Sequence, residues 1–250
     1  MNAVVVCAAI ALLLGGGGWA AGWWGWFFAI LFTVIAFVVS AMVLVRVIGR
    51  RLQPAMQRVH NQMQSGMLDA ALQGLRELLP KSRWMPMLRG QLHAQMGAIA
   101  WHAGKRKESL EWLEAAPDRL SDAKMLLASI HWRDGEKARA FDVLQRATRA
   151  DKRDRLLPNV HAWMLCKEER FDDAAKVLTR YLQKHADDSA TQDNFVRMQN
   201  RRRLAMEPFG MAWYALQLEK PPAEYGELRT ARKGFRTPPK QPKQKKQGGR

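Results

Sequence analysis

The stretch SDAKMLLASIHWRDGEKARAFDVLQRATRA (residues 121–150) decides the fold, because its pattern of small and large apolar residues returns 34 positions later, in residues 155–184. Within each stretch, a small residue is followed by another small residue after 12 positions and by a large apolar residue four positions further on. The repeating positions are Ala128, Ala140 and Leu144 in the first stretch and Ala162, Ala174 and Leu178 in the second. Small residues suit two helices that cross closely, and the large ones fill the groove toward the next pair. The two stretches therefore predict two consecutive helical pairs.

Weaker copies of the pattern lie upstream and extend the array to about four units. They occupy Gly97, Ser109 and Leu113 in one unit and Ala71 and Leu75 in the unit before it. The separations vary, with 38 positions from Ala71 to Ser109 and 31 from Ser109 to Ala140, so turns of different length are expected. Gly104 and Gly135 fall between the two helices of their units, where glycine accommodates the left-handed conformation that ends a helix.

The 34-residue spacing resembles the tetratricopeptide repeat, a helix–turn–helix unit of that length. The resemblance covers roughly residues 56–188 and implies stacked helical repeats there. The alternation of apolar and polar residues that marks half-buried strands is not sustained anywhere in this region. We therefore expect an all-α chain whose main folded unit is a tetratricopeptide-like α-solenoid.

Residues 189–220 are expected to form a capping helix and an amphipathic helix. The capping helix would run from about 189 to 206 and carry three consecutive arginines, which suit the polar end of a repeat array. The amphipathic helix follows Pro208 and places on one face Phe209, Ala212, Trp213 and Leu216. We expect this face to dock on the solenoid; the alternative is that it lies on a membrane surface.

An uncharged run predicts a membrane anchor in residues 1–46. No charged side chain occurs from 3 to 45, which exceeds the roughly 20 apolar residues that one span needs. Four glycines at 15–18 and the tryptophans after them, which suit a membrane–water interface, favour a hairpin of two transmembrane helices. The alternative is a single span near 27–45, preceded by a segment that lies in the interface or re-enters the membrane.

Basic residues follow the uncharged run at once and set its expected orientation. They are Arg46, Arg50 and Arg51. Because basic residues close to a span stay on the cytoplasmic side, the bulk of the chain is expected to be cytoplasmic, beginning with a juxtamembrane linker and helix at 47–65. The layout is similar to that of bacterial HemY-type proteins, which carry two N-terminal spans followed by repeats. This resemblance implies a location in the bacterial inner membrane.

Positive charge is concentrated at the C-terminal end of the chain. The 250 residues include 40 Lys and Arg against 23 Asp and Glu, a formal net charge of +17. The stretch 228–250 has no acidic residue, and its basic residues are Arg229, Arg232, Lys233, Arg236, Lys240, Lys243, Lys245, Lys246 and Arg250. Such a composition cannot bury a core, so residues 221–250 are expected to be a disordered tail. Its charge suits ribosomal RNA, DNA or anionic lipid.

Catalytic, cofactor-binding and metal-ligating residues are not predicted. The six histidines are not spaced as metal ligands with one another, with a cysteine or with a carboxylate. The sequence contains no phosphate-binding loop, nucleophile elbow or dinucleotide-binding glycine motif. Cys7 lies in the uncharged run and Cys166 in the repeats, where a small core residue is expected. The chain is therefore expected not to be an enzyme.

Candidate protein-binding residues lie on the first helices of the repeats. The resemblance to tetratricopeptide arrays implies that these helices line a concave groove. The residues that it assigns to this groove are Trp101, His102, Met125, Ser129, Trp132, Arg133, Trp163 and Lys167. Tryptophan and arginine are the side chains that most often anchor interfaces. The alternative for the three tryptophans is packing between helices as core residues.

These features predict a non-enzymatic scaffold that is held at the inner membrane and recruits a peptide or helix of a partner, in envelope assembly or quality control. One alternative is a tether that binds ribosomes, nucleic acid or anionic lipid through the basic tail. Another is an accessory subunit of a larger membrane complex, whose hairpin packs against partner helices. A small-molecule substrate is not expected.

Overall fold

Helices make up all the regular structure in the described part of the chain, as expected. The computed structural model describes residues 9, 26–80, 82 and 86–222. Its elements are α2 (Trp26–Gln64), α3 (Leu68–Leu78), α4 (Pro86–His102), α5 (Arg106–Ala115), α6 (Ser121–Arg133), α7 (Lys137–Ala150), α8 (Leu156–Lys167), α9 (Phe171–Leu182), α10 (Ser189–Gln199), the short 3-10 helix η2 (Glu207–Phe209) and α11 (Gly210–Ala215). The predicted first membrane helix, apart from residue 9, and the nine basic residues of the tail lie outside the described residues.

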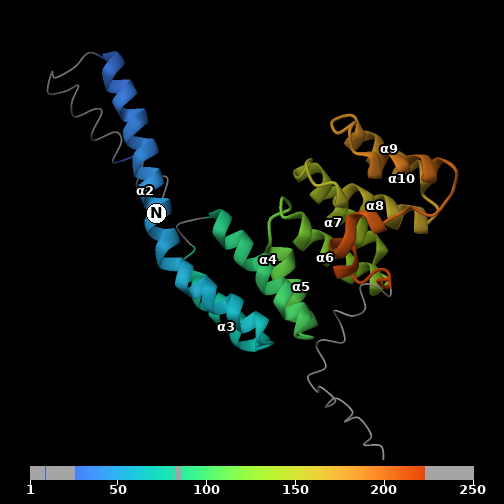
Figure 1. Ribbon diagram of the computed structural model, residues 1–250, viewed down its shortest axis with the longest axis horizontal. Coiled ribbons are helices and arrows are strands. Elements are labelled where there is room, and N and C mark those ends of the chain that lie inside the picture. Colours follow the sequence, from blue (N-terminus) through green and yellow to red (C-terminus); the bar gives the residue numbers. More distant parts are fainter. Residues whose placement is uncertain (1–8, 10–25, 81, 83–85, 223–250) are drawn as a thin grey trace, which may run out of the picture.

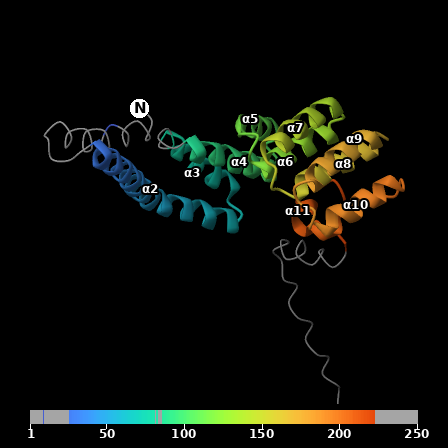
Figure 2. The ribbon, with the colours of Figure 1, turned by 90° about the horizontal axis from the view of Figure 1, so that it is seen from above.

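Consecutive helices form pairs, and the pairs stack side by side. The main pairs are α2 with α3, α4 with α5, α6 with α7 and α8 with α9. The first helices also contact one another, α4 with α6 and α6 with α8, more closely than the second helices do. The first helices α4, α6 and α8 therefore form the inner layer of a two-layer stack (Figure 1 and Figure 2). This is the packing of an α-solenoid.

The residues predicted at helix crossings are buried. Those without exposed surface are Ala71, Leu75, Ser109, Leu113, Ala128, Ala140, Leu144, Ala162, Ala174 and Leu178. At the crossing of α4 and α5, a Cβ added to Gly97 would lie 2.6 Å from Cγ of Leu113. The hydroxyl of Ser109 donates a hydrogen bond to the carbonyl oxygen of Gly97 at 2.8 Å across the same crossing. The spacing in the sequence thus identified the contact positions between paired helices.

A residue in the left-handed conformation follows the first helix of each pair. The φ angles of Gly66, Gly104 and Gly135 are 78°, 78° and 80°, which confirms the two predicted glycine turns and adds one. In the turn between α8 and α9, the same place is taken by Glu169, with φ 59°. A residue with a Cβ adopts this conformation at a cost of about 1–2 kcal/mol. Glu169 is therefore a strained position in a turn that elsewhere uses glycine.

The capping helix is shorter than predicted. α10 ends at Gln199 rather than near 206, and Arg201 has φ 52°. The side chain of Asn194 explains the early end, because its amide donates to the carbonyl oxygen of Ala205 at 3.0 Å and its Oδ1 accepts from the backbone N–H of Ala205 at 2.7 Å. The chain therefore folds back along α10. In the piece that follows, the predicted docking face is mostly correct: it buries Phe209, Trp213 and Leu216 but leaves Ala212 exposed.

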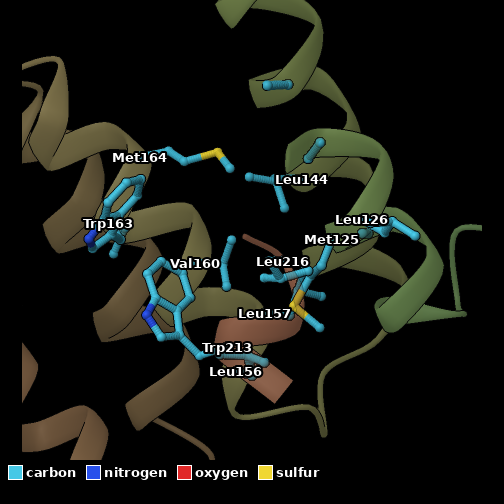
Figure 3. Close-up of a cluster of buried hydrophobic side chains, with 14 of the residues drawn as sticks. Met125, Leu126, Leu144, Leu156, Leu157, Val160, Trp163, Met164, Trp213 and Leu216 are labelled. Carbon is cyan, nitrogen blue, oxygen red and sulfur yellow. The ribbon is translucent and has the colours of Figure 1, made fainter. Parts of the chain in front are cut away.

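The core is divided into two clusters that meet at the α4–α5 pair. The smaller cluster joins the C-terminal part of α2 to α3 and α4, and the larger one extends from α5 to α11. Figure 3 shows part of the larger cluster. Lys124, which is 2% exposed, donates to the carbonyl oxygens of Leu113 at 3.0 Å and Glu114 at 3.2 Å. These carbonyls belong to the last turn of α5, where the helix dipole favours a cation. Burial nevertheless lowers the pKa of Lys124.

α2 connects the N-terminal region to the repeats without a break. It contains 39 residues, includes Pro54, and contributes Val59 to the smaller core cluster. The stretch predicted as a juxtamembrane linker and helix is helical from 47 to 64. Among the described residues, the structure contains no helix that is both long and apolar enough to cross a membrane. The transmembrane hairpin therefore stays a prediction.

Candidate protein-binding groove

The eight candidate residues lie on the three inner-layer helices of the last three pairs. α4 contributes Trp101 and His102, α6 contributes Met125, Ser129, Trp132 and Arg133, and α8 contributes Trp163 and Lys167. His102, Arg133 and Lys167 are exposed, Trp101 and Trp132 are half-buried, and Met125, Ser129 and Trp163 are buried. All eight residues thus lie in the inner layer, but only some of their side chains are open to solvent.

Each tryptophan of this layer has a cation over its ring. The pairs, with the distance from the cationic centre to the ring centre, are Arg133–Trp101 at 4.5 Å, Lys137–Trp132 at 5.7 Å and Lys167–Trp163 at 5.2 Å. Such contacts contribute about 0.5–1 kcal/mol each at exposed sites. The result is a row of apolar rings bordered by positive charge.

The segment after α10 covers the α8 end of this row. α11 brings Trp213 against Trp163, with ring centres 5.2 Å apart in an edge-to-face arrangement. Leu216 belongs to the same buried cluster as Met125 of α6 and Leu157 of α8 (Figure 3). The chain itself therefore occupies the part of the groove between α6 and α8, and the expectation that the amphipathic piece docks on the solenoid is confirmed.

Hydrogen bonds fasten this segment to both helices. Glu219 is half-buried, and its carboxylate accepts hydrogen bonds from Nε1 of Trp163 at 3.2 Å, Nε1 of Trp213 at 3.3 Å and the guanidinium of Arg203 at 2.7 Å. Arg133 donates a hydrogen bond to Oε1 of Gln217 at 3.1 Å. The polar ends of the two tryptophans are thereby satisfied inside a largely apolar contact.

Glu219 is a contact residue that the sequence pattern did not predict. Its spacing is the signal that could have indicated it. Trp213, Leu216 and Glu219 follow one another at intervals of three positions, and Glu219 is the only acidic residue in the sequence from 208 to 222. Residues three apart share a helix face, so a carboxylate at this position continues the docking face. Its partners depend on tertiary packing and could not be read from the sequence.

Two titratable groups of α8 have shifted pKa values, the buried His161 and the half-buried Cys166. Burial and then the charge of Arg170 lower the pKa of His161 to about 4, so its ring is neutral at pH 7. Burial raises the pKa of the Cys166 thiol to about 11, which disfavours the nucleophilic thiolate. The part of the chain that the structure describes contains no group of three or more His, Cys, Asp or Glu that could hold a metal ion.

Comparisons of the chain with protein-family models, with curated proteins and with solved structures gave no match. The assignment of this groove therefore rests on the packing and contacts of its own side chains. The likeness to tetratricopeptide repeats rests on the 34-residue spacing of small and large residues.

Proposed function

We propose that this protein is a non-enzymatic, tetratricopeptide-like adaptor that is anchored in a bacterial inner membrane and binds protein partners on the cytoplasmic side. The observation that carries the proposal is the row of three tryptophan–cation pairs on α4, α6 and α8. Tryptophan and arginine supply most of the binding energy in many protein interfaces. Half-buried Trp101 and Trp132 keep ring surface that a partner can cover.

The N-terminal half of α2 supports the membrane part of the proposal. Its exposed large apolar side chains are Phe27, Phe28, Ile30, Leu31, Val34, Ile35, Val38, Val39, Met42 and Val43. An exposed apolar surface of this extent marks contact with a membrane or with another protein. The arginines from Arg46 onward favour a cytoplasmic location for the repeats, because basic residues next to a span are retained on that side.

Affinity purification from detergent-solubilised membranes tests the groove. The full chain is compared with the double variant Trp132→Ala/Arg133→Ala and with Arg149→Ala, an exposed arginine on the outer-layer helix α7. The double variant is expected to lose at least one protein that the full chain and the Arg149→Ala control both retain. If a double variant with native circular dichroism keeps the same partners, the groove is not the binding surface.

The basic tail favours a second role, the binding of ribosomal RNA, DNA or anionic lipid. Nine basic residues occur in 228–250 without an acidic one. Affinity for nucleic acid falls steeply with salt, and each basic residue near an anionic membrane contributes about 1 kcal/mol. A chain that ends at Glu227 is therefore compared with the full chain at low and high salt. Membrane proteins that persist without the tail and in high salt would instead favour an accessory subunit of a membrane complex.

A further inference from the structure

Residues 210–219, which we call the latch, are set apart from the chain that precedes them. The preceding chain is pinned to α10 by the paired hydrogen bonds of Asn194 with Ala205 and by the burial of Leu204. Gly210 then adopts φ 59° and ψ −143°, a backbone conformation that is essentially restricted to glycine. Gly210 therefore joins the pinned connector to the latch through a backbone conformation that other residues rarely adopt.

The latch contacts the groove as a short bound peptide would. An aromatic, an aliphatic and an acidic side chain follow one another at intervals of three residues, namely Trp213, Leu216 and Glu219. Trp213 is 0% exposed and Leu216 is 5% exposed, while Glu219 accepts three hydrogen bonds. Trp213 and Glu219 contact Trp163 of α8, and Gln217 of the latch accepts a hydrogen bond from Arg133 of α6.

The latch is surrounded by more positive charges than it has negative charges. Glu219 is its only acidic residue. Arg133 donates to the neutral amide of Gln217, and Lys167 lies over the ring of Trp163. Among the described residues, neither Arg133 nor Lys167 forms an ion pair with a carboxylate. Two cations at the edge of the occupied groove are thus available to a more acidic occupant.

We propose that the latch is a built-in competitor for the groove, and that the partner is an acidic peptide segment with an aromatic, an aliphatic and a carboxylate side chain at the three-residue spacing of the latch. This inference rests on the proposed function. The partner displaces the latch by rotation about Gly210, covers the ring of Trp163, and places further carboxylates toward Arg133 and Lys167. Because the latch is tethered by a short linker, it competes at an effective concentration on the order of millimolar. Peptides that bind weakly, or that match only part of the latch pattern, therefore do not displace it.

Fluorescence anisotropy with a labelled synthetic peptide tests the competition. The probe is the sequence of residues 207–222, EPFGMAWYALQLEKPP, added to the full chain in detergent micelles. The variants Trp213→Ala and Glu219→Ala are expected to bind the probe about tenfold or more tighter than the unmutated chain, because the site is no longer filled. Met211→Ala, at a position 51% exposed, is the matched control and should bind as weakly as the unmutated chain. A probe with alanine at the positions of Trp213 and Glu219 should not bind.

Hydrogen exchange on the unmutated chain gives a second measurement that does not depend on variants folding. The amides of α11 should exchange faster than those of α8, through opening at Gly210, and saturating unlabelled probe should accelerate them further. If α11 exchanges only together with α8, or if both folded variants bind the probe no better than the unmutated chain, the latch is a fixed part of the core and the proposal is overturned. If instead Trp132→Ala/Arg133→Ala loses partners while the latch variants change nothing, the proposed function stands and this inference fails.

Discussion

Replacing Gly97 by alanine is expected to destabilise the protein by about 2 kcal/mol, although alanine in place of glycine normally stabilises a helix interior by about 1 kcal/mol. The added Cβ would lie 2.6 Å from Cγ and 2.7 Å from Cδ2 of Leu113, and 3.2 Å from its backbone nitrogen. Leu113 is fully buried in the core between the two helices, so it cannot turn out into solvent without leaving that core. Overpacking of this kind costs about 1–3 kcal/mol. If α4 and α5 moved apart, the hydrogen bond from Ser109 to Gly97 would also weaken, and its loss would cost about 1 kcal/mol of stability.

Gly74→Ala is the matched control, because Gly74 also lies inside a helix, α3. Its added Cβ would meet only side-chain atoms, Cγ2 of Val59 at 3.0 Å and Oε1 of Gln62 at 3.7 Å, so its stability should change by less than about 1 kcal/mol. Thermal unfolding followed by circular dichroism measures both variants. At about 2–4 °C for each kcal/mol, Gly97→Ala should lower Tm by about 4–8 °C. Equal Tm values for the two variants would refute the close crossing of α4 and α5.

Three further predictions concern stability and use urea unfolding. Glu169→Gly should raise the free energy of unfolding by about 0.5–1 kcal/mol, since glycine adopts φ 59° without the cost of a Cβ; an unchanged or lower value would contradict strain in this turn. Ser109→Ala should lower it by about 1–2 kcal/mol, because the buried hydrogen bond from its hydroxyl to the carbonyl oxygen of Gly97 is lost. The pKa of His161 is about 4 in the folded chain against 6.5 as the ordinary value, so the unfolded chain takes up the proton more readily. Stability should therefore be complete above pH 6.5 and fall by up to about 3 kcal/mol as the pH drops toward 4, and His161→Leu should remove most of this dependence.

The repeat geometry could be predicted because helix crossings restrict residue size at fixed intervals. Ala128, Ala140 and Leu144 are all fully buried, as their spacing required, and the same holds one unit later. The turns at Gly104 and Gly135 were predictable for a similar reason, since few residues other than glycine end a helix with positive φ. Glu169 was not predictable in this way, because glutamate has no preference for positive φ.

In the C-terminal part of the fold, tertiary contacts override the helix predicted from the local sequence. The sequence RRRLAM at 201–206 contains good helix formers, so continuation of the helix was the reasonable expectation. The side chain of Asn194 instead pairs with the backbone of Ala205 and turns the chain back. The periodic face around Trp213 correctly predicted docking but not the place of docking. Because the segment docks between α6 and α8, the chain itself covers a large part of the candidate groove.

The continuity of α2 connects the proposed anchor to the orientation of the groove. α2 reaches from Trp26 to Gln64 and carries Val59 into the core, so no loop separates its exposed apolar half from the first helical pair. Pro54 removes one backbone hydrogen bond and is the natural point for a bend, but the helix continues through it. If the apolar half lies in a membrane, as we propose, the repeats are held by a rigid helix rather than by a flexible tether. Each residue of a helix turns the chain by about 100°. The number of residues between Arg46 and Val59 therefore sets how the repeats are rotated about the axis of α2. This rotation determines the direction in which the inner layer and its latch face, and hence the direction from which a partner must approach.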